Sequence, residues 1–223
     1  MRVLVCIFVT LVTAPVFAVP DLSGIWMLNM PDSEGAIVFT AEGQRIQSAY
    51  DLLVDDPSLY CTPASASRVW ANPNAPIKIE QTESSILISY ELFDLRREIP
   101  LGDASMLTDL PSTRNLNGTY FAEMGSSFAR YEGERLIIES SKHAPGYIRT
   151  SRGIPQSANT RAIEELWVEA DTLHIKHTYI DASLYQQPFV LEYSFHRSNE
   201  SQIALYECTD ANYDWFEELN ARN

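Results

Sequence analysis

Short segments in which apolar and polar residues alternate follow one another along most of this chain. Alternation with a period of two is typical of β-strands with one buried face, and these segments are rich in the strand-forming residues Ile, Val, Tyr, Trp and Thr. The segments are 22–29, 77–82, 85–92, 94–100, 126–131, 134–140, 160–169, 172–180, 188–197 and 202–207. Tight turns at 131–134 and 169–172 favour hairpins, so the pattern predicts an antiparallel all-β barrel or sandwich.

One helix is expected after Thr40, a residue suited to an N-cap. Ile46, Ala49, Tyr50 and Leu53 then share one face at helical spacing. Three stretches, 55–76, 101–124 and 141–158, are expected to be irregular, and long loops of this kind are often functional rims. A short second helix is expected within residues 210–223.

The first eighteen residues have the features of a secretory signal peptide. Arg2 is followed by an apolar run, and Val16-Phe17-Ala18 fits a signal-peptidase site. The run is shorter than the roughly 20 apolar residues that span a membrane, although a retained anchor is the alternative. We therefore expect a signal peptide at 1–18, a single domain at 19–223, no membrane insertion, and a periplasmic or secreted protein.

Export changes how the cysteines are interpreted, because only Cys61 and Cys208 remain after cleavage. Secreted proteins form disulfides in oxidising compartments, so an even pair predicts one disulfide. Two free buried thiols are the alternative.

The formal net charge of −14 excludes nucleic acid as a partner, because the chain has no compensating cluster of Lys and Arg. The sequence also lacks a phosphate-binding loop, a dinucleotide fingerprint and a nucleophile elbow, so no cofactor is expected.

Metal binding is not expected either. His174 and His177 are three residues apart, but on a strand such residues point to opposite faces and cannot share an ion. The two remaining cysteines fit no zinc spacing.

A few polar residues fall on apolar strand faces. Glu164 and His177 each share a face with apolar neighbours, and a carboxylate in that position needs a partner. Arg97 and Arg130 are the candidate partners, and Tyr90 lies on a third apolar face. Two interpretations remain open: a buried structural ion pair, or the polar floor of a ligand cavity.

The start of the first strand, Gly24-Ile25-Trp26, resembles the Gly-x-Trp that opens the first strand of lipocalins and related calycin barrels. The resemblance implies that Trp26 closes one end of a barrel and that Arg197, at the end of the last strand, stacks across its indole. It also implies the fold: an antiparallel lipocalin-like β-barrel of about eight to ten strands with one or two short helices.

Longer stretches are similar to a family of exported bacterial proteins whose activity is not assigned. They are DLSGIW, PIKIEQT, RREIPLG, ARYEGERLIIES, SANTRAIEEL, TLHIKHTYIDASLYQQPF and YECTDANYD. Where the family often has histidine, this chain has Ser126, and its C-terminal motif has Thr209 in place of another histidine, so a histidine-dependent role is in doubt. The resemblance directs attention to polar positions, namely Gln81, Glu91, Arg97, Arg130, Glu139, Glu164, Thr178 and Asp181.

These features favour a protein that binds a small hydrophobic molecule inside a barrel. The residues expected to orient the ligand are Tyr90, Glu91, Arg97, Arg130, Glu139, Glu164 and His177. The first alternative is a cofactor-independent isomerase, lyase or hydratase, with His177 or Glu164 as general acid or base and Arg97 or Arg130 stabilising an oxyanion. The second alternative is a structural or assembly protein with a filled barrel.

Overall fold

The computed structural model describes residues 19–29, 33–199 and 201–209. The strands are β1 (Gly24–Leu28), β2 (Ser33–Glu34), β3 (Ile77–Gln81), β4 (Ser85–Tyr90), β5 (Leu95–Pro100), β6 (Thr113–Asn115), β7 (Ser126–Glu132), β8 (Arg135–Ser141), β9 (Gly146–Arg149), β10 (Ile154–Gln156), β11 (Arg161–Glu169), β12 (Thr172–Ile180) and β13 (Phe189–Arg197). The α-helices are α1 (Ala41–Ala49), α2 (Leu52–Asp55) and α3 (Ala66–Trp70), and short 3₁₀ turns lie at Pro57–Tyr60, Leu92–Asp94, Ala104–Met106, Ala122–Met124 and Thr150–Arg152.

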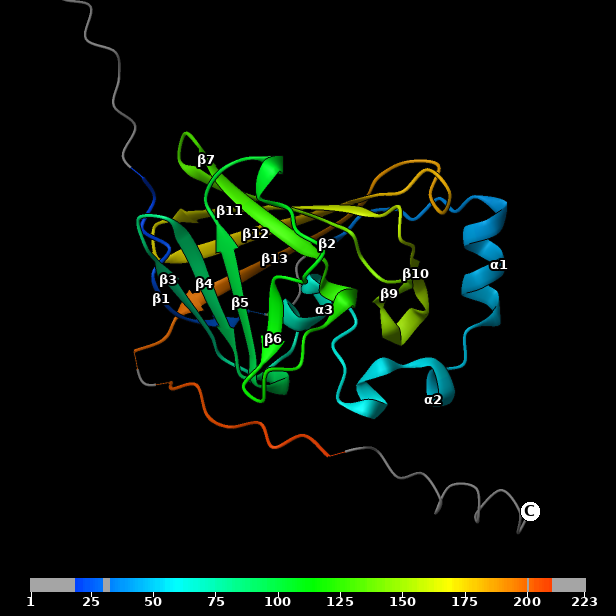
Figure 1. The fold of residues 1–223 in the computed structure, drawn as a ribbon, viewed down its shortest axis with the longest axis horizontal. Helices are drawn as coiled ribbons and strands as arrows, with labels where there is room; N and C mark the ends of the chain where they lie inside the picture. The colour runs from blue at the N-terminus through cyan, green and yellow to red at the C-terminus, as the bar shows by residue number, and fades with distance from the viewer. Residues whose placement is uncertain (1–18, 30–32, 200, 210–223) are drawn as a thin grey trace, which may run out of the picture.

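One large antiparallel sheet dominates the fold. Its strand order is β6-β5-β4-β3-β1-β13-β12-β11-β8-β7, and β2 adds to β13. The two ends of the sheet approach each other, because Leu101 bridges to Ala129 and the Gly102 amide donates to the Ala129 carbonyl at 2.8 Å. The strands therefore wrap around an interior (Figure 1), which confirms the prediction of an antiparallel all-β fold with few, short helices.

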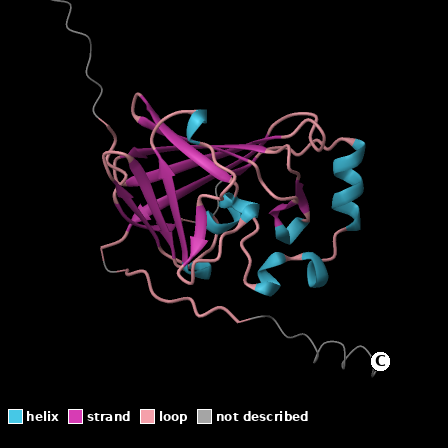
Figure 2. Cartoon of the chain, viewed as in Figure 1, coloured by secondary structure: helices cyan, strands magenta, loops and turns pink. Residues whose placement is uncertain are grey.

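The alternating pattern places apolar side chains in this interior. On β12, Leu173, Ile175, His177 and Tyr179 are buried, whereas the intervening residues are half-buried. His174 and His177 consequently face opposite sides of the strand, as predicted. Helices α1 and α2 and the small β9–β10 sheet lie beside one end of the large sheet (Figure 2). None of the helices in the described ranges has the length and apolar character needed to traverse a membrane.

The expected helix is shorter than the sequence pattern suggested. Thr40 does cap α1, with its side chain accepting from the Gly43 amide at 3.1 Å. The helix ends at Ala49 because Tyr50 adopts an extended backbone, and Asp51 caps the separate helix α2. Leu53 therefore does not share a buried face with the residues of α1, and it is 44 % exposed.

The prediction of a strand at 202–207 is wrong. This segment joins no sheet, and Glu207 within it has a left-handed backbone conformation. Its Ala204 and Tyr206 amides donate to the carboxylates of Glu91 and Asp94, at 3.0 and 2.9 Å, instead of to a neighbouring strand. We call residues 201–209 the C-terminal strap.

The three stretches expected to be irregular contain short elements that the sequence pattern missed. Helix α3 lies within 55–76, β6 within 101–124, and β9 and β10 within 141–158. Each has five residues or fewer, too few to show a helical or strand period. The helix expected within 210–223 lies outside the described residues.

Candidate functional site

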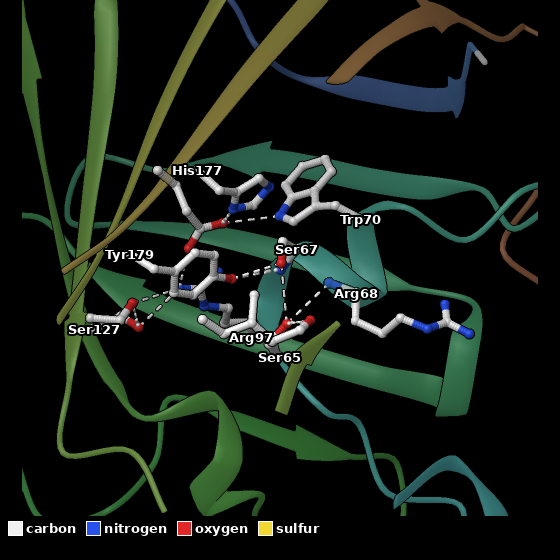
Figure 3. A network of polar contacts seen from close by, with 11 residues as sticks. Ser65, Ser67, Arg68, Trp70, Arg97, Ser127, His177 and Tyr179 are labelled. Carbon is white, nitrogen blue, oxygen red and sulfur yellow. Dashed lines mark hydrogen bonds and ion pairs between the residues drawn. The ribbon is translucent and has the colours of Figure 1, made fainter. Parts of the chain in front are cut away.

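The interior contains a buried ion pair between β5 and β11. Arg97 Nη2 lies 2.7 Å from Glu164 Oε1, and both side chains are completely buried. Arg97 Nη2 also donates to the hydroxyls of Ser127 and Ser140, each at 3.0 Å (Figure 3). Arg97, and not Arg130, is therefore the partner of Glu164.

Helix α3 brings further polar groups to this cluster. Trp70 Nε1 donates to Glu164 Oε2 at 3.0 Å. Ser65 caps the helix and donates to the Ile148 carbonyl at 2.8 Å. Tyr179 donates to the Ser67 hydroxyl at 2.8 Å, and the Ser67 amide donates back to the Tyr179 oxygen at 3.2 Å (Figure 3). These hydrogen bonds thus tie α3 to the neighbouring strands β11 and β12 of the large sheet and to β9 of the small sheet.

The environment sets the charge state of the cluster. Burial raises the pKa of Glu164, but the charge of Arg97 and the hydrogen bonds from Arg97 and Trp70 bring the pKa below its ordinary value. Burial lowers the pKa of His177 to about 4, which the nearby Glu164 charge only partly opposes. At neutral pH Glu164 is ionised and His177 is neutral. A solvent-shielded carboxylate that stays ionised is poorly suited to act as a general acid.

Several polar atoms around Arg97 have no hydrogen-bond partner among the described residues. They are Tyr90 Oη, Arg97 Nε and Nη1, and both ring nitrogens of His177. An unsatisfied buried polar group costs roughly 1–3 kcal/mol. Aromatic side chains pack closely beside them: the Trp70 ring centroid lies 5.6 Å from that of Tyr90 and 5.3 Å from that of Phe195. Polar and aromatic side chains therefore meet in the interior around Arg97 and Trp70.

Three of the residues expected to orient a ligand do not join the interior cluster. Arg130 and Glu139 lie on the outer face of β7 and β8, where Arg130 Nη1 is 2.6 Å from Glu139 Oε1. Glu91 lies in the turn after β4 and accepts a bond from the C-terminal strap. The residues expected to orient a ligand therefore do not form one site. Those on strands are divided between the interior and the outer surface, because alternate strand residues face opposite sides, and Glu91 lies in a turn.

Of the other positions to which the resemblance drew attention, Gln81 and Asp181 have hydrogen-bond partners elsewhere in the fold. Gln81 accepts from the Leu22 amide at 2.6 Å and donates to the Tyr131 hydroxyl at 2.8 Å. Asp181 accepts a bond from Thr160 at 2.8 Å, and Thr178 is half-buried on the opposite face of β12 from His177. These contacts place Gln81, Thr178 and Asp181 outside the Arg97–Glu164 cluster.

The contact implied by the lipocalin resemblance is present. The Arg197 guanidinium lies 4.3 Å from the centroid of the Trp26 ring, and the two residues are cross-strand partners on β1 and β13. Trp26 is completely buried and donates to the Leu22 carbonyl at 2.9 Å. Gly24 has a φ of +136°, and a Cβ at this position would collide with the Arg197 guanidinium. Glycine is therefore required where β1 begins.

The disulfide between Cys61 and Cys208 is present, as predicted. It joins the C-terminal strap to the segment that precedes α3. Beside it, the Phe93 and Tyr206 rings meet edge to face at 5.4 Å. A hollow of about 490 Å³ lies under the strap, with Arg68 and Asn72 among its lining residues.

A larger groove, of about 860 Å³, lies on the outer surface of the barrel. Outward-facing residues of β4 and β5, including Leu87 and Arg96, form one wall. The connection from β5 to β6, which passes beside β7 (Figure 1), contributes Met106 and Leu110. We call this hollow the outer groove. Sequence reasoning missed it because its residues come from outward strand positions and from a stretch without periodicity.

Comparisons with known proteins give distant structural similarities only. No family model matches the chain, and no curated protein matches it in sequence. The fatty acid transporter REP1-NXSQ is similar at 14% identity and a TM-score of 0.41, over 81% of this chain and 98% of that one. Wild-type fluorescent protein UnaG is similar at 11% identity and a TM-score of 0.38, over 79% and 97%. Apo lipid binding protein 8 of Caenorhabditis elegans is similar at 9% identity and a TM-score of 0.36, over 81% and 100%.

Proposed function

We propose that this protein binds a small, mainly hydrophobic molecule in the outer groove. The observation that carries the proposal is the exposure of apolar side chains along this hollow: Met106, Leu110 and Tyr120 are 42%, 53% and 43% exposed. Exposed apolar patches with polar surroundings mark binding sites, and ligand pockets have volumes of roughly 300–1,000 Å³. The outer groove combines both properties.

The proposed binding site lies on the barrel wall, whereas the sequence pattern predicted a site in the barrel interior. In the interior, Glu164 lies 3.0 Å from Trp70 and 3.9 Å from His177, and none of the three residues lines either hollow described above. Arg97 and Ser127 are shared, because they line the outer groove and also belong to the interior cluster. The groove is therefore the described hollow that comes nearest to the predicted polar residues.

A binding assay with a neutral, environment-sensitive dye such as Nile red tests the proposal. The double variant Met106→Ser/Leu110→Ser should weaken binding by about thirtyfold, since two apolar contacts of roughly 1 kcal/mol each are lost. Leu53→Ser is the matched control, because Leu53 is similarly exposed but lies on α2. Equal binding by the parent and the double variant would refute the groove as the ligand site.

The second candidate function is assembly, and a separate observation favours it. Four exposed apolar side chains, Leu52, Leu53, Val54 and Tyr60, lie on α2 and the turn that follows it. A filled barrel with such a patch suits a protein that associates through its surface. Sedimentation analysis distinguishes the two candidates, because Leu53→Asp/Val54→Asp should dissociate an oligomer built on this patch and leave dye binding unchanged.

We also propose that the protein is exported and that residues 19–223 form a single domain. We further propose that the chain is related to the family of exported bacterial proteins and to calycin barrels. The apolar leader sequence and the disulfide support export, because disulfides persist in oxidising compartments. Mass spectrometry of the protein recovered from the periplasm or medium of its host should find a chain that begins at Val19. Recovery of the uncleaved chain from the cytoplasm would contradict export.

A further inference from the structure

Two arginines face each other across neighbouring strands in the outer groove. Arg96 on β5 and Arg114 on β6 are cross-strand partners, and both line the groove. Directly opposed residues share a face of the sheet, and like charges in this position destabilise it. The repulsion between the two arginines therefore lowers the stability of the sheet at this point.

The pair has no carboxylate partner within the described residues. Arg96 Nη1 donates only to backbone carbonyls, to Leu95 at 2.8 Å and to Tyr90 at 3.4 Å, and no ion pair within 4.0 Å involves Arg96 or Arg114. Most other described arginines do have a carboxylate within that distance, namely Arg45, Arg97, Arg130, Arg135, Arg149, Arg152 and Arg161. The contrast stands out in a chain with 30 acidic and 16 basic residues.

The groove's own carboxylates do not neutralise the pair. Glu80 lies 2.9 Å from Lys78 on the same strand. Glu98, two residues after Arg96, also lines the groove but is beyond 4.0 Å from both guanidinium groups. The two arginines thus remain available to an anionic group of a bound molecule.

We infer that Arg96 and Arg114 form a clamp for the anionic group of an amphipathic ligand. This inference rests on the proposed function, because the apolar part of the same ligand would lie against Met106 and Leu110 in the outer groove. Guanidinium groups donate several hydrogen bonds in a planar fork that matches carboxylate, phosphate or sulfate oxygens. Two hydroxyl groups also line this part of the groove and add hydrogen-bond donors. Tyr120 forms an isolated β-bridge with Arg114, and Ser89 is the cross-strand partner of Arg96 on β4.

Three probes with the same chain test the inference: dodecanoate, dodecyl phosphate and dodecanol, each below its aggregation concentration. Calorimetry should show the two anions binding about tenfold more tightly than the alcohol at low salt, because hydrogen bonds to charged groups are stronger than neutral ones. Tighter binding of only one anion would identify the head group. Salt should reduce the preference, since the clamp is open to solvent.

The variant Arg96→Gln/Arg114→Gln should remove the preference for the anions, so that all three probes bind it with similar affinity. Its melting temperature should equal or exceed that of the parent, because two opposed like charges are removed. Arg135→Gln is the control, an arginine on another part of the barrel that pairs with Glu165. A parent that binds alcohol and anions equally, or a double variant that retains the preference, would overturn the clamp.

A titration with inorganic phosphate alone separates the clamp from the proposed function. Phosphate should shift the Nε–Hε NMR signals of Arg96 and Arg114 in the parent protein, and unshifted signals would contradict the clamp. If phosphate shifts these signals while Met106→Ser/Leu110→Ser leaves binding of all three chain probes unchanged, the clamp stands and the apolar groove fails. If dodecanol binding depends on Met106 and Leu110 but phosphate shifts neither arginine, the groove stands and the clamp fails.

Discussion

Replacing Glu164 with glutamine removes the charge that faces Arg97 and keeps the size of the side chain. The carboxylate accepts from Arg97 at 2.7 Å and from Trp70 at 3.0 Å, and both members of the ion pair are completely buried. The variant would leave the Arg97 charge in the interior without its counter-charge. Breaking a buried pair in this way costs about 3–5 kcal/mol. We therefore expect Glu164→Gln to lose that much free energy of unfolding.

The next residue on β11 supplies a matched control. Glu165 faces outward and pairs with Arg135 at 3.1 Å and with Lys176 at 3.0 Å, at the partly exposed barrel surface. Solvent-exposed pairs contribute about 0–1 kcal/mol each. Glu165→Gln makes the same chemical change one position away, and we expect it to cost about 1 kcal/mol.

Urea denaturation followed by tryptophan fluorescence measures both changes. For a domain of this size, about 3–5 kcal/mol corresponds to a fall in melting temperature of roughly 6–20 °C. If Glu164→Gln unfolded at the same urea concentration as Glu165→Gln, the buried pair would not hold the fold as argued. The variant Arg97→Met/Glu164→Leu removes both charges and should be more stable than Glu164→Gln alone, because no unpaired charge remains.

Three further predictions concern other parts of the barrel. Trp26→Ala should cost about 3–5 kcal/mol in urea unfolding, because a fully buried indole is removed, and unchanged stability would contradict its role at the barrel end. Cys61→Ser/Cys208→Ser should lose about 2–5 kcal/mol, since the disulfide spans 147 positions and restricts the unfolded chain, and treating the parent with reductant should give the same loss. His177 has a folded pKa of about 4 against 6.5 for a free side chain, so the unfolded state takes up the proton first as the pH falls. Stability should therefore decrease between pH 6.5 and about 4 by up to about 1.4 kcal/mol per pH unit, and His177→Gln, measured by denaturation across this range, should show a shallower dependence.

The strands could be predicted from the sequence because each longer strand has one buried face. On β12 the alternation is strict, so His177 could be assigned to the interior and His174 to the outside. Glu164 could likewise be placed on an apolar face. The choice between Arg97 and Arg130 as its partner could not be made, because it depends on which strand face turns inward across the barrel.

The parts that sequence reasoning missed lack a period. Trp70 belongs to a five-residue helix within a proline-containing stretch, and only the three-dimensional fold brings its indole to Glu164. The outer groove combines outward strand residues such as Arg96 with loop residues such as Leu110. Polar residues at outward-facing strand positions usually contact only solvent. No local sequence pattern therefore distinguished Arg96 from other surface arginines.

The adjacency of β1 and β13 has a consequence for how the chain is made. Trp26 is opposite Arg197, and the Arg197 side chain donates to the Ser23 carbonyl across 174 positions of sequence. During synthesis, one edge of β1 therefore stays without its neighbour until β13 has been made. Closing so distant a contact is slow compared with forming hairpins such as β11–β12. β1 is thus made before the other described strands and is among the last to be paired on both edges, and until then its unpaired edge is open to pairing with another chain.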